Sequence, residues 1–124
     1  MSGRQQRGRR SQQLGVDTEA SAEAALAQDG WTVHARRLRT AAGEIDLVAE
    51  KDGLLAFVEV KARPRLREAA EAVTPRQRAR LLAAAEIVLA EHPAWGMAGV
   101  RFDLIVVDAA GRVRRIVDAF RAEE

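Results

Sequence analysis

The sequence predicts a single α/β (α+β) domain with the element order helix, strand, strand, strand, helix, strand, strand. At 124 residues the chain has room for one compact domain and one hydrophobic core. Hydrophobic residues make up 48% of it, and the 31% of charged residues is mixed in sign, which is typical of a folded protein. We therefore expect one domain over residues 14–124, preceded by a disordered basic arm at residues 1–13.

Apolar periodicity and capping signals define the helices and the outer strands. A helix over residues 18–29 presents small and apolar side chains on one face, and Gly30 ends it. A strand follows from Trp31, and residues 39–42 form a short connection. The predicted elements after residue 73 are a helix opened by the capping box Thr74-Pro75-Arg76-Gln77 and ending near Glu91, then strands at residues 100–108 and 112–118.

The strongest local signal is a β-hairpin around Asp52-Gly53. Two apolar, β-rich runs, residues 43–51 and 54–62, flank this dipeptide. Asp-Gly favours a two-residue turn in which both positions have positive φ. The turn therefore pairs Lys51 with Leu54 and fixes the register of both strands.

That register places four charged side chains together. Asp46 lies opposite Glu59, and Glu44 lies opposite Lys61. Residues two apart on a strand share a face, so all four side chains project from the same side of the hairpin. Opposed Cβ atoms are roughly 4.5–5.5 Å apart, at which distance two carboxylates repel each other.

A hard divalent cation offsets this repulsion, and Mg²⁺ is bound through one or two carboxylates together with water and phosphate oxygens. Lys61 is placed to hold an attacking water or to stabilise transition-state charge. The alternative is a solvated sheet face with a cross-strand ion pair, the more common meaning of Glu-x-Lys alone. A second carboxylate within two otherwise apolar strands favours the metal site.

The positive charge is carried mainly by arginine, since Lys51 and Lys61 are the only lysines, and it is clustered along the chain. Arginine suits bidentate contact with phosphate, so we expect a nucleic acid partner, although an arginine-rich proteome explains the composition equally well. The residues expected to contact nucleic acid are Arg36, Arg37, Arg39, Arg63, Arg76, Arg78 and Arg80.

Several other classes are excluded. The chain has no cysteine, so disulfides, thiolate metal sites and a cysteine nucleophile are ruled out. No apolar run approaches the roughly 20 residues of a membrane span, and we expect a cytoplasmic protein. Neither His34 nor His92 has a neighbour that implies catalysis.

Gly-Glu-Ile-Asp at residues 43–46, followed by Val-Glu-Val-Lys at residues 58–61, resembles the YraN-like family of small bacterial proteins. The resemblance runs from about Leu14 to Phe120. These proteins belong to the restriction-endonuclease-like, PD-(D/E)xK superfamily. The resemblance implies a restriction-endonuclease-like core, in which helices flank a central mixed sheet of about five strands.

The resemblance also implies roles for individual residues. Asp46 and Glu59 correspond to metal ligands for Mg²⁺ or Mn²⁺, and Lys61 to the residue that positions or activates water. The backbone carbonyl of Val60 completes the metal shell in such sites. The family places a further glutamate on the first helix, where Glu19 is the candidate and Glu23, one turn on, is the rival.

The resemblance leads to two main hypotheses. The first is a metal-dependent endonuclease acting on DNA, with branched or damaged DNA as candidate substrates and a homodimer left open. The second is an inactive nucleic-acid-binding or accessory protein that retains the nuclease fold, and a protein-interaction module is a weaker third. One departure concerns Gln77, which stands where family members often have lysine, so any function of that lysine is in doubt here.

Overall fold

The computed structural model describes residues 18–67 and 73–120, so the predicted arm at residues 1–13 lies outside the described residues. It confirms the predicted fold class and element order, with a five-stranded mixed sheet and two helices. The elements are a first helix at residues 18–28, β1 (Thr32–Thr40), β2 (Gly43–Lys51), β3 (Leu54–Ala62), α2 (Pro75–Glu91), β4 (Gly99–Val107) and β5 (Val113–Ile116).

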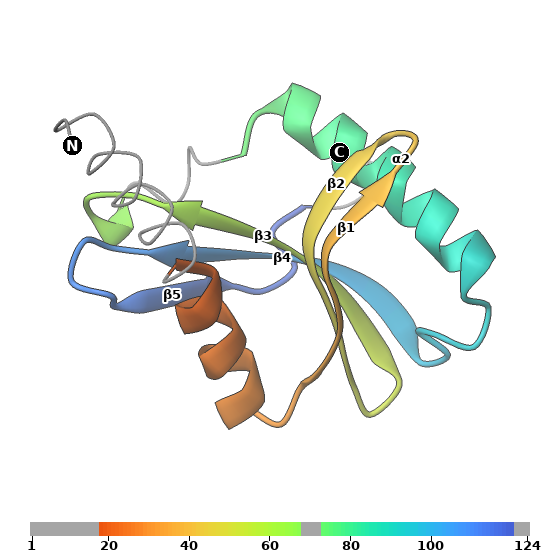
Figure 1. Cartoon of the computed structure of the whole chain (residues 1–124), viewed down its shortest axis with the longest axis horizontal. Helices are drawn as coiled ribbons and strands as arrows, with labels where there is room; N and C mark the ends of the chain where they lie inside the picture. Colours follow the sequence, from red (N-terminus) through yellow and green to blue (C-terminus); the bar gives the residue numbers. More distant parts are fainter. Residues whose placement is uncertain (1–17, 68–72, 121–124) are drawn as a thin grey trace, which may run out of the picture.

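The strands lie side by side in the order in which they occur in the sequence, β1-β2-β3-β4-β5. All neighbours are antiparallel except β3 and β4, which run parallel. A parallel pair needs a crossover, and α2 supplies it. Figure 1 shows α2 on one side of the strongly twisted sheet and the first helix on the other. Neither helix of the described part is long and apolar enough to cross a membrane.

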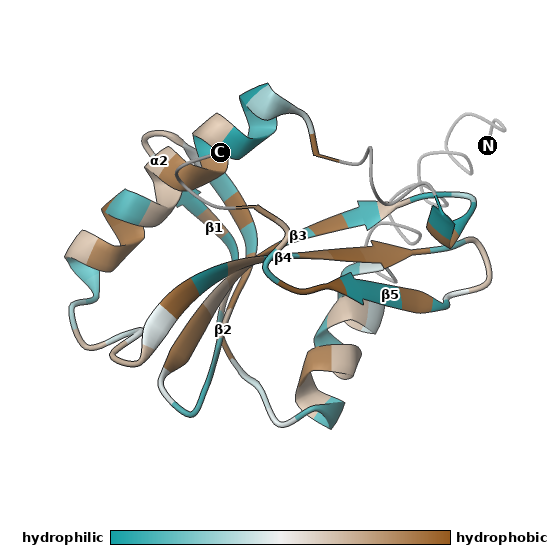
Figure 2. Cartoon of the chain, turned by 180° about the vertical axis from the view of Figure 1, so that it is seen from behind, coloured by the Kyte–Doolittle hydropathy of each residue, from teal (hydrophilic) through white to brown (hydrophobic). Residues whose placement is uncertain are grey.

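Two hydrophobic layers, one on each face of the sheet, hold the helices in place. On β3, Leu55 and Phe57 pack with α2, whereas Ala56 and Val58 pack with the first helix. Because side chains alternate along a strand, a continuous apolar run serves both layers. Figure 2 shows the resulting hydrophobic colour along the central strands, while both helices carry mixed colours.

The capping box predicted at the start of α2 is present. The Thr74 hydroxyl accepts the N–H of Gln77 at 3.2 Å, and the Gln77 side-chain oxygen accepts the N–H of Thr74 at 2.9 Å. Two of the unpaired N–H groups at the helix start are thereby satisfied. Pro75 occupies the first helical position, as predicted, and His92 ends the helix.

The segment before β2 differs from the predicted short connection at residues 39–42, because β1 continues through Thr40. The Thr40 hydroxyl accepts the N–H groups of Ala42 and Gly43, both at 3.1 Å, and donates to the Gly43 carbonyl at 2.7 Å. One threonine side chain thus closes a tight turn that carries none of the usual Asn-Gly or Asp-Gly signals.

The register predicted for the central hairpin is confirmed over residues 47–58, but the predicted pairs Asp46–Glu59 and Glu44–Lys61 lie beyond the end of the ladder. Lys51 pairs with Leu54, and the ladder runs back to Leu47 opposite Val58. It stops there, although both strands continue, so β2 leaves β3 at Asp46 while remaining paired with β1.

The buried carboxylate of Asp103 links the elements at the β5 edge of the sheet. Asp103 is fully buried on β4 and accepts two hydrogen bonds from Arg101, at 2.8 and 2.9 Å, and one from Arg115 of β5 at 3.2 Å. It also accepts the N–H of Asp118 at 3.0 Å. Arg115 in turn contacts Asp29 at 3.0 Å, so this cluster links β4, β5 and the end of the first helix.

Removing Asp103 should therefore destabilise the protein severely. Asp103→Ala leaves two arginines without their buried partner, and we expect a loss of about 3–5 kcal/mol in the free energy of unfolding. The matched control is Arg112→Ala, which removes a side chain that is 77% exposed from its ion pair with Asp108 and should cost less than about 1 kcal/mol. Urea unfolding measures both values, and similar losses would show that the Asp103 cluster has no special role.

Candidate functional site

The candidate site lies where β2 and β3 diverge. The Asp46 side chain accepts the N–H of Val60 at 2.8 Å, and so satisfies a β3 donor that β2 no longer pairs. The N–H and C=O of one strand residue point to the same edge of the strand. The carbonyl of Val60 therefore faces the same gap as Asp46.

Asp46 and Glu59 are two carboxylates that influence each other next to this gap. Burial raises the pKa of Glu59 to about 7, and the negative charge of Asp46 contributes to the rise. Burial also raises the pKa of Asp46, while the hydrogen bond from Val60 opposes that shift. Both carboxylates are thus poorly solvated as anions, and each is more easily ionised when a cation is near.

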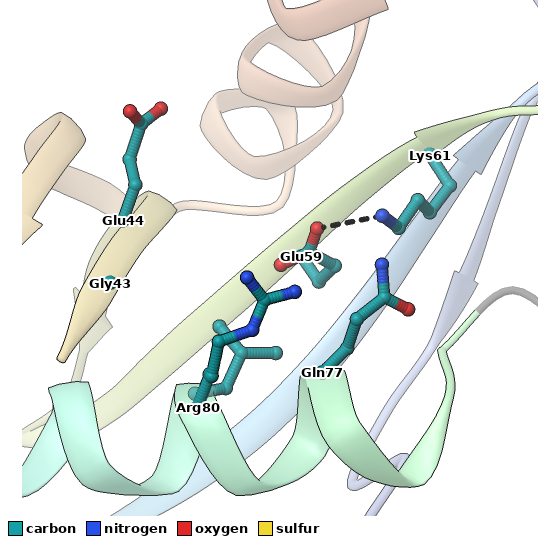
Figure 3. A pocket seen from close by; sticks show the side chains of 7 residues that line it. Gly43, Glu44, Glu59, Lys61, Gln77 and Arg80 are labelled. Atoms are coloured by element: carbon teal, nitrogen blue, oxygen red, sulfur yellow. Dashed lines mark ion pairs between the residues drawn. The ribbon is translucent and has the colours of Figure 1, made fainter.

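Lys61 is the nearest cation. Its Nζ lies 3.2 Å from Oε1 of Glu59, and the Lys61 and Glu59 side chains are only 19% and 13% exposed. Figure 3 shows both side chains reaching into a cleft opposite Gln77 and Arg80 of α2, while Glu44 points away from them. The cleft has a volume of about 240 Å³ and is lined by Gly43, Glu44, Glu59, Lys61, Gln77, Arg80 and Leu81.

This donor set suits a hard divalent cation. Two adjacent carboxylates and a backbone carbonyl are oxygen ligands of the kind that Mg²⁺ and Mn²⁺ prefer. Within the described residues, no three His, Cys, Asp or Glu side chains converge on one metal position. Mg²⁺ does not require three, because it keeps several waters and takes substrate phosphate oxygens as further ligands.

The two glutamates of the first helix are ion-paired with β1. Both carboxylate oxygens of Glu19 lie 3.0 Å from Nε of Arg37, and Glu23 accepts a hydrogen bond from Nε of Arg36 at 2.7 Å. Of these two glutamates, only Glu19 acts on Asp46, whose pKa its negative charge raises. Glu19 is therefore electrostatically linked to Asp46.

The arginines expected to contact nucleic acid fall into three groups. Only Arg80 lines the cleft. The three on β1 are engaged with glutamates, the third being Arg39, which lies 3.8 Å from Glu44. The others lie elsewhere: Arg78 packs over the Phe120 ring at 5.7 Å, Arg63 bonds the Ala62 carbonyl at 2.7 Å, and Arg76 is exposed at the start of α2.

The β1 ion pairs were not anticipated from the sequence. Arg36 and Arg37 are separated from their glutamate partners by 13 and 18 residues along the chain. These separations are beyond the range of any local spacing rule. The available signal was the matching of charge runs, acidic on the first helix and basic on β1. Neither histidine lines the cleft; both stack on Trp95, with ring centroids 4.6 Å away for His34 and 3.7 Å for His92.

The raised pKa of Glu59 predicts how stability depends on pH without divalent cations. Between the ordinary value of 4.5 and about 7, the folded state binds more protons than the unfolded state. Stability is therefore fully present below pH 4.5 and decreases as pH rises through 7, by roughly 3 kcal/mol for a shift of this size. Unfolding in urea with EDTA from pH 5 to pH 8 measures this loss.

Glu59→Gln should remove most of this dependence and make the protein more stable than the wild type at pH 8. The matched control is Glu86→Gln on the exposed side of α2, which should leave the wild-type profile unchanged. If Glu59→Gln and wild type share one profile, Glu59 is not the titrating group.

The family of the chain follows from its similarity to known proteins. The model of the family described as "Uncharacterised protein family UPF0102" matches residues 18–107. A UPF0102 protein of Granulibacter bethesdensis is 62% identical over 95% of this chain and 75% of its own length. A UPF0102 protein of Acidiphilium cryptum is 52% identical over 94% of the chain and 90% of its own, and one of Rhodopseudomonas palustris is 49% identical over 87% and 83%. The chain therefore belongs to the UPF0102, or YraN-like, family.

Proposed function

We propose that this protein is a metal-dependent endonuclease that hydrolyses phosphodiester bonds in nucleic acid, with DNA as the expected substrate. The observation that carries the proposal is the pair of poorly solvated carboxylates, Asp46 and Glu59, with Lys61 beside them at the mouth of a cleft. A purely structural role for this arrangement is hard to support, because the two carboxylates destabilise each other.

Asp46, Glu59 and the carbonyl of Val60 are the groups that would hold Mg²⁺ or Mn²⁺. The bound cation would polarise the scissile phosphate and lower the pKa of a nearby water. Glu19 would join the ligands directly or through water. The buried hydrophobic layers behind Asp46 and Glu59 support this role, because they fix both strands on which the ligands stand.

Lys61 has a separate task. Its ammonium group, held 3.2 Å from Glu59, is a mobile donor within reach of the same cleft. From there it would orient the attacking water or stabilise the negative charge that develops on the phosphoryl oxygens. With the charge of Glu59 offset by a bound cation, Lys61 would be able to turn towards the substrate.

The opposite wall of the cleft would hold the phosphate. Arg80 is exposed and lines the cleft together with Gln77. A guanidinium group binds two phosphate oxygens at once, and a neutral amide adds a donor without repelling Arg80. Gln77 thus combines its capping role with a place on the wall of the cleft.

The test is cleavage of labelled linear, single-stranded and branched DNA with Mg²⁺ or Mn²⁺. Asp46→Ala should abolish cleavage, and Lys61→Ala should lower the rate by about 100-fold or more, since it removes a transition-state donor. EDTA should stop the reaction in the wild type.

Lys51→Ala is the matched control. Lys51 is the only other lysine, lies at the far end of the hairpin and bonds the Asp29 carbonyl, so its removal should leave the rate unchanged. Cleavage that persists in Asp46→Ala would identify a contaminating nuclease and refute the assignment. Tight, salt-sensitive DNA binding with no cleavage under any of these conditions would instead favour an inactive binding protein.

A further inference from the structure

Arg37 occupies an unusual position beside the candidate metal ligands. On β1, Arg36 pairs with Leu47 and Leu38 pairs with Ile45, which places Arg37 directly opposite Asp46. Its φ of 46° lies in the left-handed region that side chains rarely adopt. Such strain is concentrated at functional sites in proteins.

The negative charges around Arg37 belong to carboxylates at or next to the candidate metal site. Its Nε lies 3.0 Å from both oxygens of Glu19. The negative charges of Glu44 and Asp46 also favour its protonated form and help to raise its pKa. Arg37 therefore supplies positive charge to the acidic group that a divalent cation would otherwise neutralise.

We propose that Arg37 competes with the divalent cation for Glu19, and that cation binding releases its guanidinium group to bind the substrate phosphate. This inference rests on the proposed function. It adds a mechanism by which the metal and the nucleic acid bind cooperatively at one site.

The ion pair is suited to such an exchange. The Arg37 and Glu19 side chains are 55% and 29% exposed, so their attraction is screened by solvent and is weak. A cation bound to Glu19 contributes two positive charges where Arg37 contributed one. Release therefore leaves the carboxylates neutralised and gives the phosphate an additional arginine with the bidentate geometry that it favours.

The neighbouring pair provides a natural comparison. Arg36 and Glu23 form the same kind of ion pair between β1 and the first helix. The pKa of Arg36 is raised by Glu23 alone, whereas Glu44 and Asp46 contribute to that of Arg37. Arg36→Gln therefore removes the same charge one residue away and frees Glu23, whose charge, unlike that of Glu19, does not act on Asp46.

The first experiment measures Mn²⁺ affinity by calorimetry on the whole 124-residue chain. Arg37→Gln should bind Mn²⁺ about 3- to 5-fold more tightly than the wild type, the range expected for loss of a weak competing ion pair. Arg36→Gln should change the affinity by less than about 2-fold. In a Glu19→Gln background, Arg37→Gln should give a gain no larger than that of Arg36→Gln, because Arg37 no longer has a ligand to release.

The second experiment measures binding of a labelled DNA duplex by fluorescence anisotropy, in Ca²⁺ and in EDTA. Arg37→Gln should weaken binding about 5- to 10-fold in Ca²⁺ and by less than about 2-fold in EDTA, because the guanidinium group is freed only when the cation is bound. Arg36→Gln should have the same effect in both buffers.

The outcomes separate the two proposals. If the wild type does not bind Mn²⁺, or if Asp46→Asn leaves its affinity unchanged, the metal site itself is refuted and the inference with it. If Asp46→Asn abolishes Mn²⁺ binding but Arg37→Gln and Arg36→Gln behave alike, only the role of Arg37 is refuted.

Discussion

The candidate site depends on the separation of β2 from β3 at Asp46. Between Leu47 and Lys51, β2 is paired with β3 along the backbone. Beyond Leu47 this pairing ends, and the Asp46 carboxylate accepts the N–H of Val60 at 2.8 Å instead. A continuous ladder would leave no space between the strands, and Asp46 would be an ordinary side chain on a sheet face. One hydrogen bond thus both closes the end of the ladder and positions a carboxylate beside Glu59.

The same separation determines the electrostatics. Glu59 follows four buried residues of β3, so its carboxylate is poorly hydrated and its pKa rises to about 7. The apolar strands that stabilise the fold therefore make this pair of acids costly to ionise. Asp103 is fully buried, and Arg101 and Arg115 lie against its carboxylate. The contrast separates a carboxylate that serves the fold from carboxylates that lack a full set of partners.

Much of this architecture could be predicted from the sequence, because its signals are local. Asp52-Gly53 fixed the hairpin register, and Thr74 to Gln77 fixed the start of α2. The end of β1 was missed because a single Thr40 hydroxyl closes that turn, which no dipeptide signal indicates. The point at which β2 leaves β3 could not be predicted either, since it depends on how the sheet twists over two helices.

The arginines show why charge clusters are hard to interpret from a sequence. The run at residues 36–39 resembled a surface for phosphate, yet each of its three arginines lies against a glutamate. These arginines are ion-paired with glutamates of the same protein, so they bind a partner only if those ion pairs break. The net charge of +2 conceals this arrangement, because it counts both members of each pair. Any affinity for nucleic acid at this face must then include the free energy of exchanging one carboxylate partner for another, so it depends on whatever else binds those carboxylates.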